Sequence, residues 1–172
     1  MNLQSTDFEL FAVPKSFAQD STLLDARWKE LQKEAHPDKF VAQGAAAQRI
    51  AMQWSVRINE AYQRLKDPVQ RAAYLCGLNA APINAENNTA MPAAFLMQQM
   101  ELREALDEAA TEENLDEISL QAANIKRDML SKAEREMDQE KDFPSAAQTV
   151  RALLFIQKFQ ADVDRRFELL GQ

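Results

Sequence analysis

The sequence predicts an all-α protein, both from its composition and from the spacing of its apolar residues. Only 3 Gly and 6 Pro occur in 172 residues, and the strong helix formers Ala, Leu, Glu, Gln and Lys are abundant. Apolar residues recur every three or four positions, the spacing of one helix face. Apolar stretches stay far short of the roughly 20 residues that a membrane-spanning helix needs. We expect a cytoplasmic protein with no export signal and no membrane partner.

Charge and composition divide the chain into two predicted domains, residues 1–78 and 91–172. The first holds 10 basic and 9 acidic side chains, and the second holds 10 basic and 17 acidic ones. Residues 79–90 lack apolar periodicity and contain four Asn, which favour turns, so we expect a linker there. The acidic second half argues against nucleic-acid binding, which needs dense Lys and Arg. One cysteine, Cys76, cannot form an internal disulfide or a zinc site alone, so we expect no metal and no cofactor.

The first domain opens with two predicted helical segments. An apolar cluster at residues 8–13, closed by Pro14, is consistent with one or two buried turns. The next helix covers residues 21–35, and Ser21 is its expected N-cap because a hydroxyl can accept a hydrogen bond from a free backbone amide. Pro37 ends this helix, since proline disfavours helical geometry in the residue before it. Its apolar stripe consists of Leu24, Trp28, Leu31 and Ala35.

A second long helix follows and ends at residues 66–68, with a short fourth one at 72–78. Two long amphipathic helices joined by a short loop form an antiparallel hairpin, whose tip would expose His36-Pro37-Asp38. A small basic face beside that tip would steer an acidic partner surface towards it. The apolar stripe of the second long helix consists of Ile50, Trp54, Ile58, Ala61 and Leu65. The basic face consists of Arg27, Lys29, Lys33 and Lys39.

Three helices are predicted in the second domain, forming a three-helix bundle. The first starts near Pro92. Thr111 is the expected N-cap of the second, which continues to about Lys141. The third opens at Pro144, a residue suited to the first helical position, and ends near Gly171. The core-facing stripe of the first helix consists of Phe95, Gln99, Leu102, Leu106 and Ala109.

The opposite side of that first helix is apolar where a solvent-facing side should be polar. Large apolar side chains set among glutamates indicate an interaction patch, in which methionines supply adaptable contact area. The alternative is a sandwiched helix with both sides in a core. The residues on this side are Leu96, Met97, Met100, Glu101, Glu104 and Glu108.

The tripeptide His36-Pro37-Asp38 and two later segments together resemble the J-domain of co-chaperones that stimulate ATP hydrolysis in DnaK-type chaperones. The chain departs from the commoner J-domain form at Ala35, where an aromatic residue often precedes the histidine. The later matching residues are Ile58-Asn59-Glu60-Ala61-Tyr62, Leu65, Asp67, Pro68, Arg71, Ala72 and Tyr74.

Residues 94–104 and 150–159 extend the resemblance over the whole chain and narrow it to the HscB family of iron–sulfur cluster assembly. This resemblance implies a non-enzymatic co-chaperone of two domains in an L-shaped arrangement. Its partners would be an HscA-type ATPase chaperone, bound by the tripeptide and the basic face, and an IscU-type scaffold protein. By position, the scaffold would be contacted by Leu96, Met97, Met100, Glu101, Arg103, Glu104, Glu108 and Phe155.

Other functions stay open on the sequence. An enzyme could use His36 as a base oriented by Asp38, but no second histidine, Gly-rich phosphate loop or ligand cluster accompanies them. A helical adaptor would bind a partner through the patch without affecting any ATPase. A general J-domain co-chaperone would serve another client, although the chain lacks a Gly/Phe-rich stretch and a cysteine-rich module.

Overall fold

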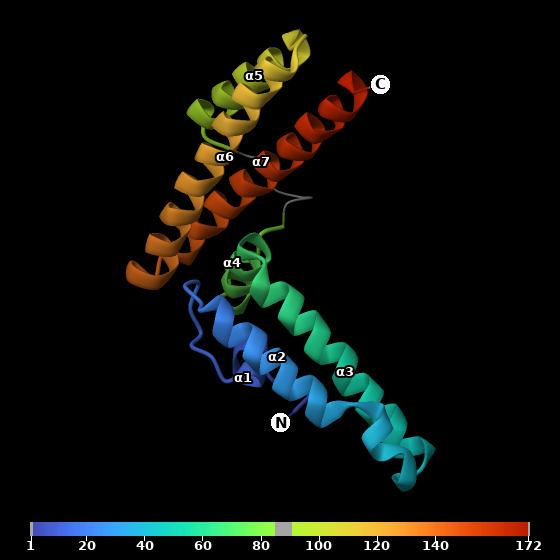
Figure 1. Ribbon diagram of the computed structural model, residues 1–172. Coiled ribbons are helices and arrows are strands. Elements are labelled where there is room, and N and C mark those ends of the chain that lie inside the picture. The colour runs from blue at the N-terminus through green and yellow to red at the C-terminus, as the bar shows by residue number, and fades with distance from the viewer. Residues whose placement is uncertain (1, 85–90, 172) are drawn as a thin grey trace. The chain divides into compact units, whose positions relative to one another are not determined.

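The computed structural model describes residues 2–84 and 91–171, and in these residues it contains helices and no strand (Figure 1). The predicted all-α class is confirmed. The chain forms two compact units, Met1–Leu75 and Cys76–Gln172. Their boundary falls three residues before the end predicted for the first domain, and residues 85–90 of the predicted linker lie outside the described part. The α-helices are α1 (Asp7–Phe11), α2 (Ser21–Ala35), α3 (Ala45–Lys66), α4 (Pro68–Leu78), α5 (Ala93–Glu108), α6 (Glu112–Glu134) and α7 (Phe143–Leu170).

The N-cap of α2 lies one residue earlier than expected. Asp20, not Ser21, is the N-cap: its Oδ1 accepts hydrogen bonds from the backbone amides of Thr22 and Leu23, at 2.9 and 3.3 Å. A carboxylate satisfies two free amides and also interacts favourably with the positive end of the helix dipole. The helix bounds themselves agree with the predicted range 21–35.

The core of the first unit lies between α1, α2 and α3. The predicted stripe on α3 needs one correction, because Ile50 is 55% exposed whereas Ala51 is buried. The buried face of α3 runs from Ala51 to Ile58 and on to Leu65 in steps of seven residues, and Ile50 lies about 100° away from it. The fully buried large side chains of this core include Phe8, Phe11, Leu24, Ile58 and Leu65.

A buried carboxylate ties α1 to α3. Asp7 has no exposed surface. It accepts hydrogen bonds at 2.6 and 2.9 Å from Arg64 and lies 2.7 Å from a guanidinium nitrogen of Arg57. Its backbone amide donates to the hydroxyl of Tyr74 at 3.0 Å. The Asp7 side chain thus contacts two arginines of α3 and its backbone contacts Tyr74 of α4, which makes Asp7 central to the first unit.

The second unit contains the three predicted helices, α5, α6 and α7. Thr111 caps α6 as predicted, accepting from the amide of Asn114, and Asp142 caps α7. The helix expected to reach about Lys141 is α-helical only to Glu134 and continues as one π-helical turn over Arg135–Gln139. The core shared by the three helices consists of Leu102, Leu106, Ala109, Leu115, Ile118, Ala122, Ile156, Phe159 and Val163.

Candidate functional site

The His36-Pro37-Asp38 loop lies between the end of α2 and the start of α3. Because Pro37 follows, His36 leaves the helical region (φ −61°, ψ 127°), and Pro37 then opens a 3₁₀ helix that extends to Gln43. The amide of Asp38 donates to Nδ1 of His36 at 3.2 Å. Gly44, at φ +96°, closes the 3₁₀ helix in a conformation that favours glycine.

Both polar side chains of the loop face solvent, with 56% of the His36 side chain and 88% of the Asp38 side chain exposed. In this geometry Nδ1 faces the backbone of the turn, and Nε2 is the ring nitrogen left to meet a partner. The ring is held on a compact turn by a hydrogen bond from the backbone two residues later.

Polar side chains between α2 and α3 hold the hairpin below the loop. The side-chain oxygen of Asn59 accepts from Trp28 Nε1 at 2.9 Å and from Gln32 Nε2 at 2.8 Å. The hydroxyl of Tyr62 donates to Asp25 at 2.5 Å, and this hydrogen bond raises the pKa of Tyr62. Two residues of the segment that resembles a J-domain therefore act as cross-helix ties that keep the tip in place.

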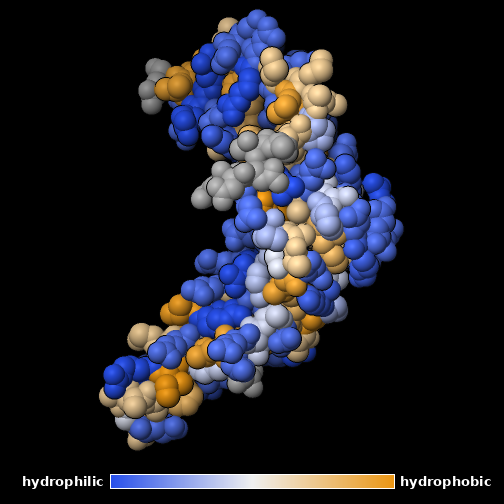
Figure 2. All heavy atoms as spheres, turned by 180° about the vertical axis from the view of Figure 1, so that it is seen from behind, coloured by the Kyte–Doolittle hydropathy of each residue, from blue (hydrophilic) through white to orange (hydrophobic). Residues whose placement is uncertain are grey.

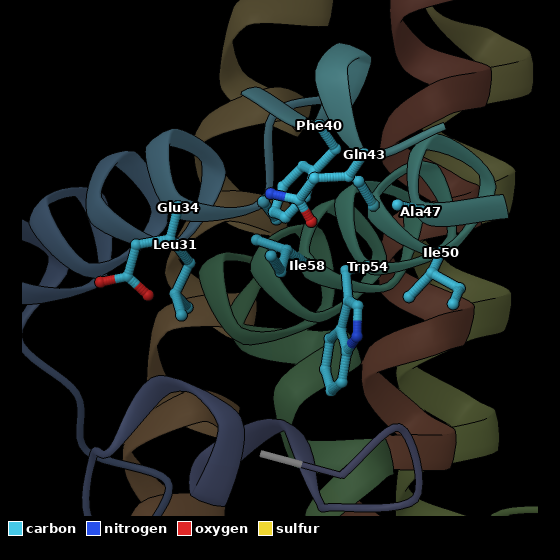
Figure 3. A pocket seen from close by; sticks show the side chains of 10 residues that line it. Leu31, Glu34, Phe40, Gln43, Ala47, Ile50, Trp54 and Ile58 are labelled. Carbon is cyan, nitrogen blue, oxygen red and sulfur yellow. The ribbon is translucent and has the colours of Figure 1, made fainter. Parts of the chain in front are cut away.

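An apolar groove of about 490 Å³ lies directly beside the loop, between α2, the 3₁₀ helix and α3 (Figure 3). The side chain of Ala35 ends at Cβ and leaves space that a larger residue before His36 would occupy. The lining residues include Leu31, Phe40, Trp54 and Ile58, which Figure 3 labels, and Ala51.

The basic face beside the loop is only partly available. Lys29, Lys33 and Lys39 are exposed. Arg27 is half-buried and its guanidinium lies 3.3 Å from the carboxylate of Glu30 one turn later. The three lysines are therefore more accessible than Arg27, whose Nη1 is engaged by Glu30.

On the second unit, α5 presents a patch that we define as Leu96, Met97, Met100 and Phe155. Met97 is 62% and Met100 is 71% exposed, so α5 is not sandwiched within this unit. Phe155 reaches the patch from α7, and its ring packs edge-on against Phe95 with centroids 6.1 Å apart. On the face that Figure 2 shows, apolar residues are interspersed with hydrophilic ones.

The charged residues predicted on α5 divide into two kinds. Glu101, Glu104 and Glu108 are exposed around the patch. Arg103 is half-buried, and its guanidinium donates at 2.5 Å to Asp162 on α7. Sequence reasoning missed Asp162, because a partner on another helix leaves no trace in the local spacing around Arg103.

Comparisons with known proteins agree with this architecture. Residues 91–164 match the family model of the HSCB C-terminal oligomerisation domain. A curated co-chaperone protein HscB homolog of Burkholderia cenocepacia is 44% identical over 173 residues, covering 99% of this chain and 98% of that protein. The solved chaperone HscB from Vibrio cholerae is 34% identical, with a TM-score of 0.82 over 96% of this chain and 99% of that one. The human co-chaperone protein HscB, 24% identical, shares the fold with a TM-score of 0.90 over 95% and 83% of the two chains.

These relatives define the class: a two-unit, all-α co-chaperone with a J-type hairpin. More particularly, the chain belongs to the HscB family. In the described residues, no helix is long and apolar enough to cross a membrane, and no group of three or more His, Cys, Asp or Glu side chains is arranged to hold a metal ion.

Proposed function

We propose that this protein stimulates ATP hydrolysis by an HscA-type chaperone in the cytoplasm and delivers an IscU-type iron–sulfur scaffold to it. The observation that carries the proposal is the exposed His36-Pro37-Asp38 loop, supported by a cross-braced hairpin and accompanied by a separate apolar patch on the other unit. Residues 1–78 would then serve the chaperone and residues 91–172 the scaffold.

The stimulation needs no acid or base from this chain. His36 and Asp38 would bind the chaperone more tightly in its hydrolysis-competent state than in its resting state, and this differential affinity shifts the population towards hydrolysis. The three exposed lysines, Lys29, Lys33 and Lys39, would steer an acidic chaperone surface to the loop.

The patch has the features of a protein-binding surface. Exposed methionines and a leucine supply apolar contact area, and Phe155 supplies a rigid aromatic anchor. The surrounding glutamates would fix the position of the bound partner along α5. A scaffold held there is raised in effective concentration beside the chaperone that the other unit has bound. Tighter binding of the scaffold by the chaperone after hydrolysis would favour transfer of its iron–sulfur cluster.

Single-turnover ATP hydrolysis by the HscA-type chaperone tests the proposal, with and without the scaffold. Wild type is expected to accelerate hydrolysis, and more so with the scaffold present. His36→Gln should abolish the acceleration while leaving scaffold affinity unchanged, because His36 lies on the loop and not on the patch. Acceleration without any scaffold dependence would indicate a general J-domain co-chaperone with another client, and no acceleration by wild type would refute the proposal.

A further inference from the structure

The half-buried Arg103 differs from the other α5 residues expected to touch the scaffold. On α5, Leu102 and Leu106 are buried in the bundle core, and Phe95 and Ala105 pack against the same core while only partly buried. These apolar contacts hold the 16-residue helix in place, but apolar contacts have no preferred direction and leave room for small rotations of the helix about its own axis. A directional polar tie beside them therefore affects which way the outer face of α5 points.

Arg103 supplies such a tie to α7. Its Nη1 donates to Asp162 Oδ2 at 2.5 Å, and the guanidinium carbon lies 5.3 Å from the centre of the buried Phe159 ring. Asp162 is 24% exposed, so the ion pair is partly shielded from water. Arg165 also approaches Asp162, at 3.8 Å, but its own side chain is 71% exposed. Arg103 is thus held by a carboxylate and by an aromatic ring, both on α7.

The ion pair occupies Nη1 of Arg103, and the Phe159 ring lies against the guanidinium. Direct binding of the scaffold by Arg103 would therefore be limited to its remaining N–H groups, in the orientation that α7 imposes. The neighbouring residues Met100 and Glu104 are exposed and are not limited in this way. The hydrogen bond from Arg103 lowers the pKa of the Asp162 carboxyl, so the pair is ionised at neutral pH.

We propose that Arg103 is a positioning residue: its ion pair with Asp162 fixes the rotation of α5 and thereby presents Met97 and Met100 to the scaffold. The inference rests on the proposed function for the identity of the partner. It changes the expected role of Arg103 from a contact to a tie, and it assigns a role to Asp162, which is not among the patch residues.

The test is a double-mutant cycle on scaffold affinity. Arg103→Met and Asp162→Asn are each expected to weaken binding about tenfold, which corresponds to about 1.4 kcal/mol, and the double variant should bind no worse than either single one. The exchanged pair, Arg103→Asp with Asp162→Arg, should recover most of the affinity. Arg165→Gln is the matched control, since it removes the other, exposed cation near Asp162, and it should bind like wild type.

Methyl NMR of the free protein separates this inference from the proposed function. The methyl resonances of Met97 and Met100 should shift in Arg103→Met and in Asp162→Asn, but not in Arg165→Gln. Unmoved resonances would overturn the inference whether or not the scaffold binds. Asp162→Asn binding the scaffold like wild type, while Arg103→Met binds it weakly, would also overturn it and make Arg103 a direct contact. A wild type that binds no scaffold, with shifted resonances in both variants, would leave the tie intact and refute the proposed partner.

Discussion

The two units support their exposed surfaces in opposite ways. In the first unit, a polar loop at the tip of the α2–α3 hairpin is held by polar ties, with Asn59 bridging Trp28 and Gln32, and Asp7 joining α1 to α3. In the second unit, an apolar patch lies on a helix that rests on a continuous apolar core, with the Arg103–Asp162 pair as the tie between α5 and α7.

This difference follows from what each surface has to present. Three consecutive residues on a turn must be held in one backbone geometry, and directional hydrogen bonds achieve this best. A patch spread over two helices depends mainly on how the helices pack, which apolar contacts provide, with one polar tie to orient α5. Damage to the first surface should therefore come from single polar substitutions, and damage to the second from the loss of contact area or of the Arg103–Asp162 pair.

The largest expected effect is a loss of folding stability in the first unit, caused by Asp7→Asn. Removing one member of a buried ion-pair group leaves the guanidinium groups of Arg57 and Arg64 without their carboxylate, which costs about 3–5 kcal/mol. Urea denaturation followed separately in each unit would measure it. The second unit, and with it scaffold binding, should be unaffected.

Asp25→Asn is the matched control for Asp7→Asn. Asp25 also accepts a hydrogen bond from a cation, Lys66, but its side chain is 42% exposed. Because solvent screens this pair, the loss of folding stability should be much smaller. Equal losses for the two variants would contradict the central role of the buried carboxylate in the first unit.

The second-largest expected effect is a loss of scaffold affinity when three patch residues are replaced together by Ala. These residues are Leu96, Met97 and Phe155. Loss of this apolar area is expected to weaken scaffold binding about 100-fold, whereas scaffold-independent ATPase stimulation should persist. Calorimetric titration with the scaffold measures the affinity. Leu120→Ala removes a leucine of α6 that is 64% exposed and outside the patch, and a comparable loss from that variant would mean that binding is not localised to the patch.

A smaller effect is expected from filling the groove beside the loop. Ala35→Phe adds an aromatic ring where the lining is apolar, and should stabilise the first unit by about 0.5–2 kcal/mol while ATPase stimulation is retained. Thermal denaturation measures the change. Ala46→Phe, at an exposed position of α3 outside the groove, should give no gain; a gain from it equal to that of Ala35→Phe would show that the groove is irrelevant.

The smallest expected effect is on how the stability of the second unit depends on pH in acid. The pKa of Asp162 is lowered from its ordinary value of 3.8 by Arg103, so its contribution to folding is present above that value and is lost as the pH falls through the lowered pKa. The stability difference between wild type and Asp162→Asn should therefore narrow below pH 3.8. Asp116→Asn, at an exposed position of α6, serves as the control. A difference that stays constant with pH would mean that the pair contributes nothing through its charge.

Much of the fold could be predicted from local patterns. Helix positions followed from apolar spacing, Thr111 was recognisable as a cap, and Pro37 marked the end of α2. The error at Ser21 arose because Asp20 and Ser21 are both good caps, and only the backbone geometry distinguishes them. The error at Ile50 arose because a one-residue shift of the buried face still leaves a plausible stripe.

By itself the sequence determined the all-α class, the exposed His36-Pro37-Asp38 turn and the apolar outer side of α5, because each depends on residues within a few positions of one another. Only the tertiary structure decided that Asp7 joins α1 to α3, that Ala35 leaves a groove beside the loop, and that Arg103 is paired with Asp162. The two ion pairs join residues 57 and 59 positions apart, and the groove depends on the space between packed helices. Periodicity along the chain carries no information about which distant side chains meet in the fold.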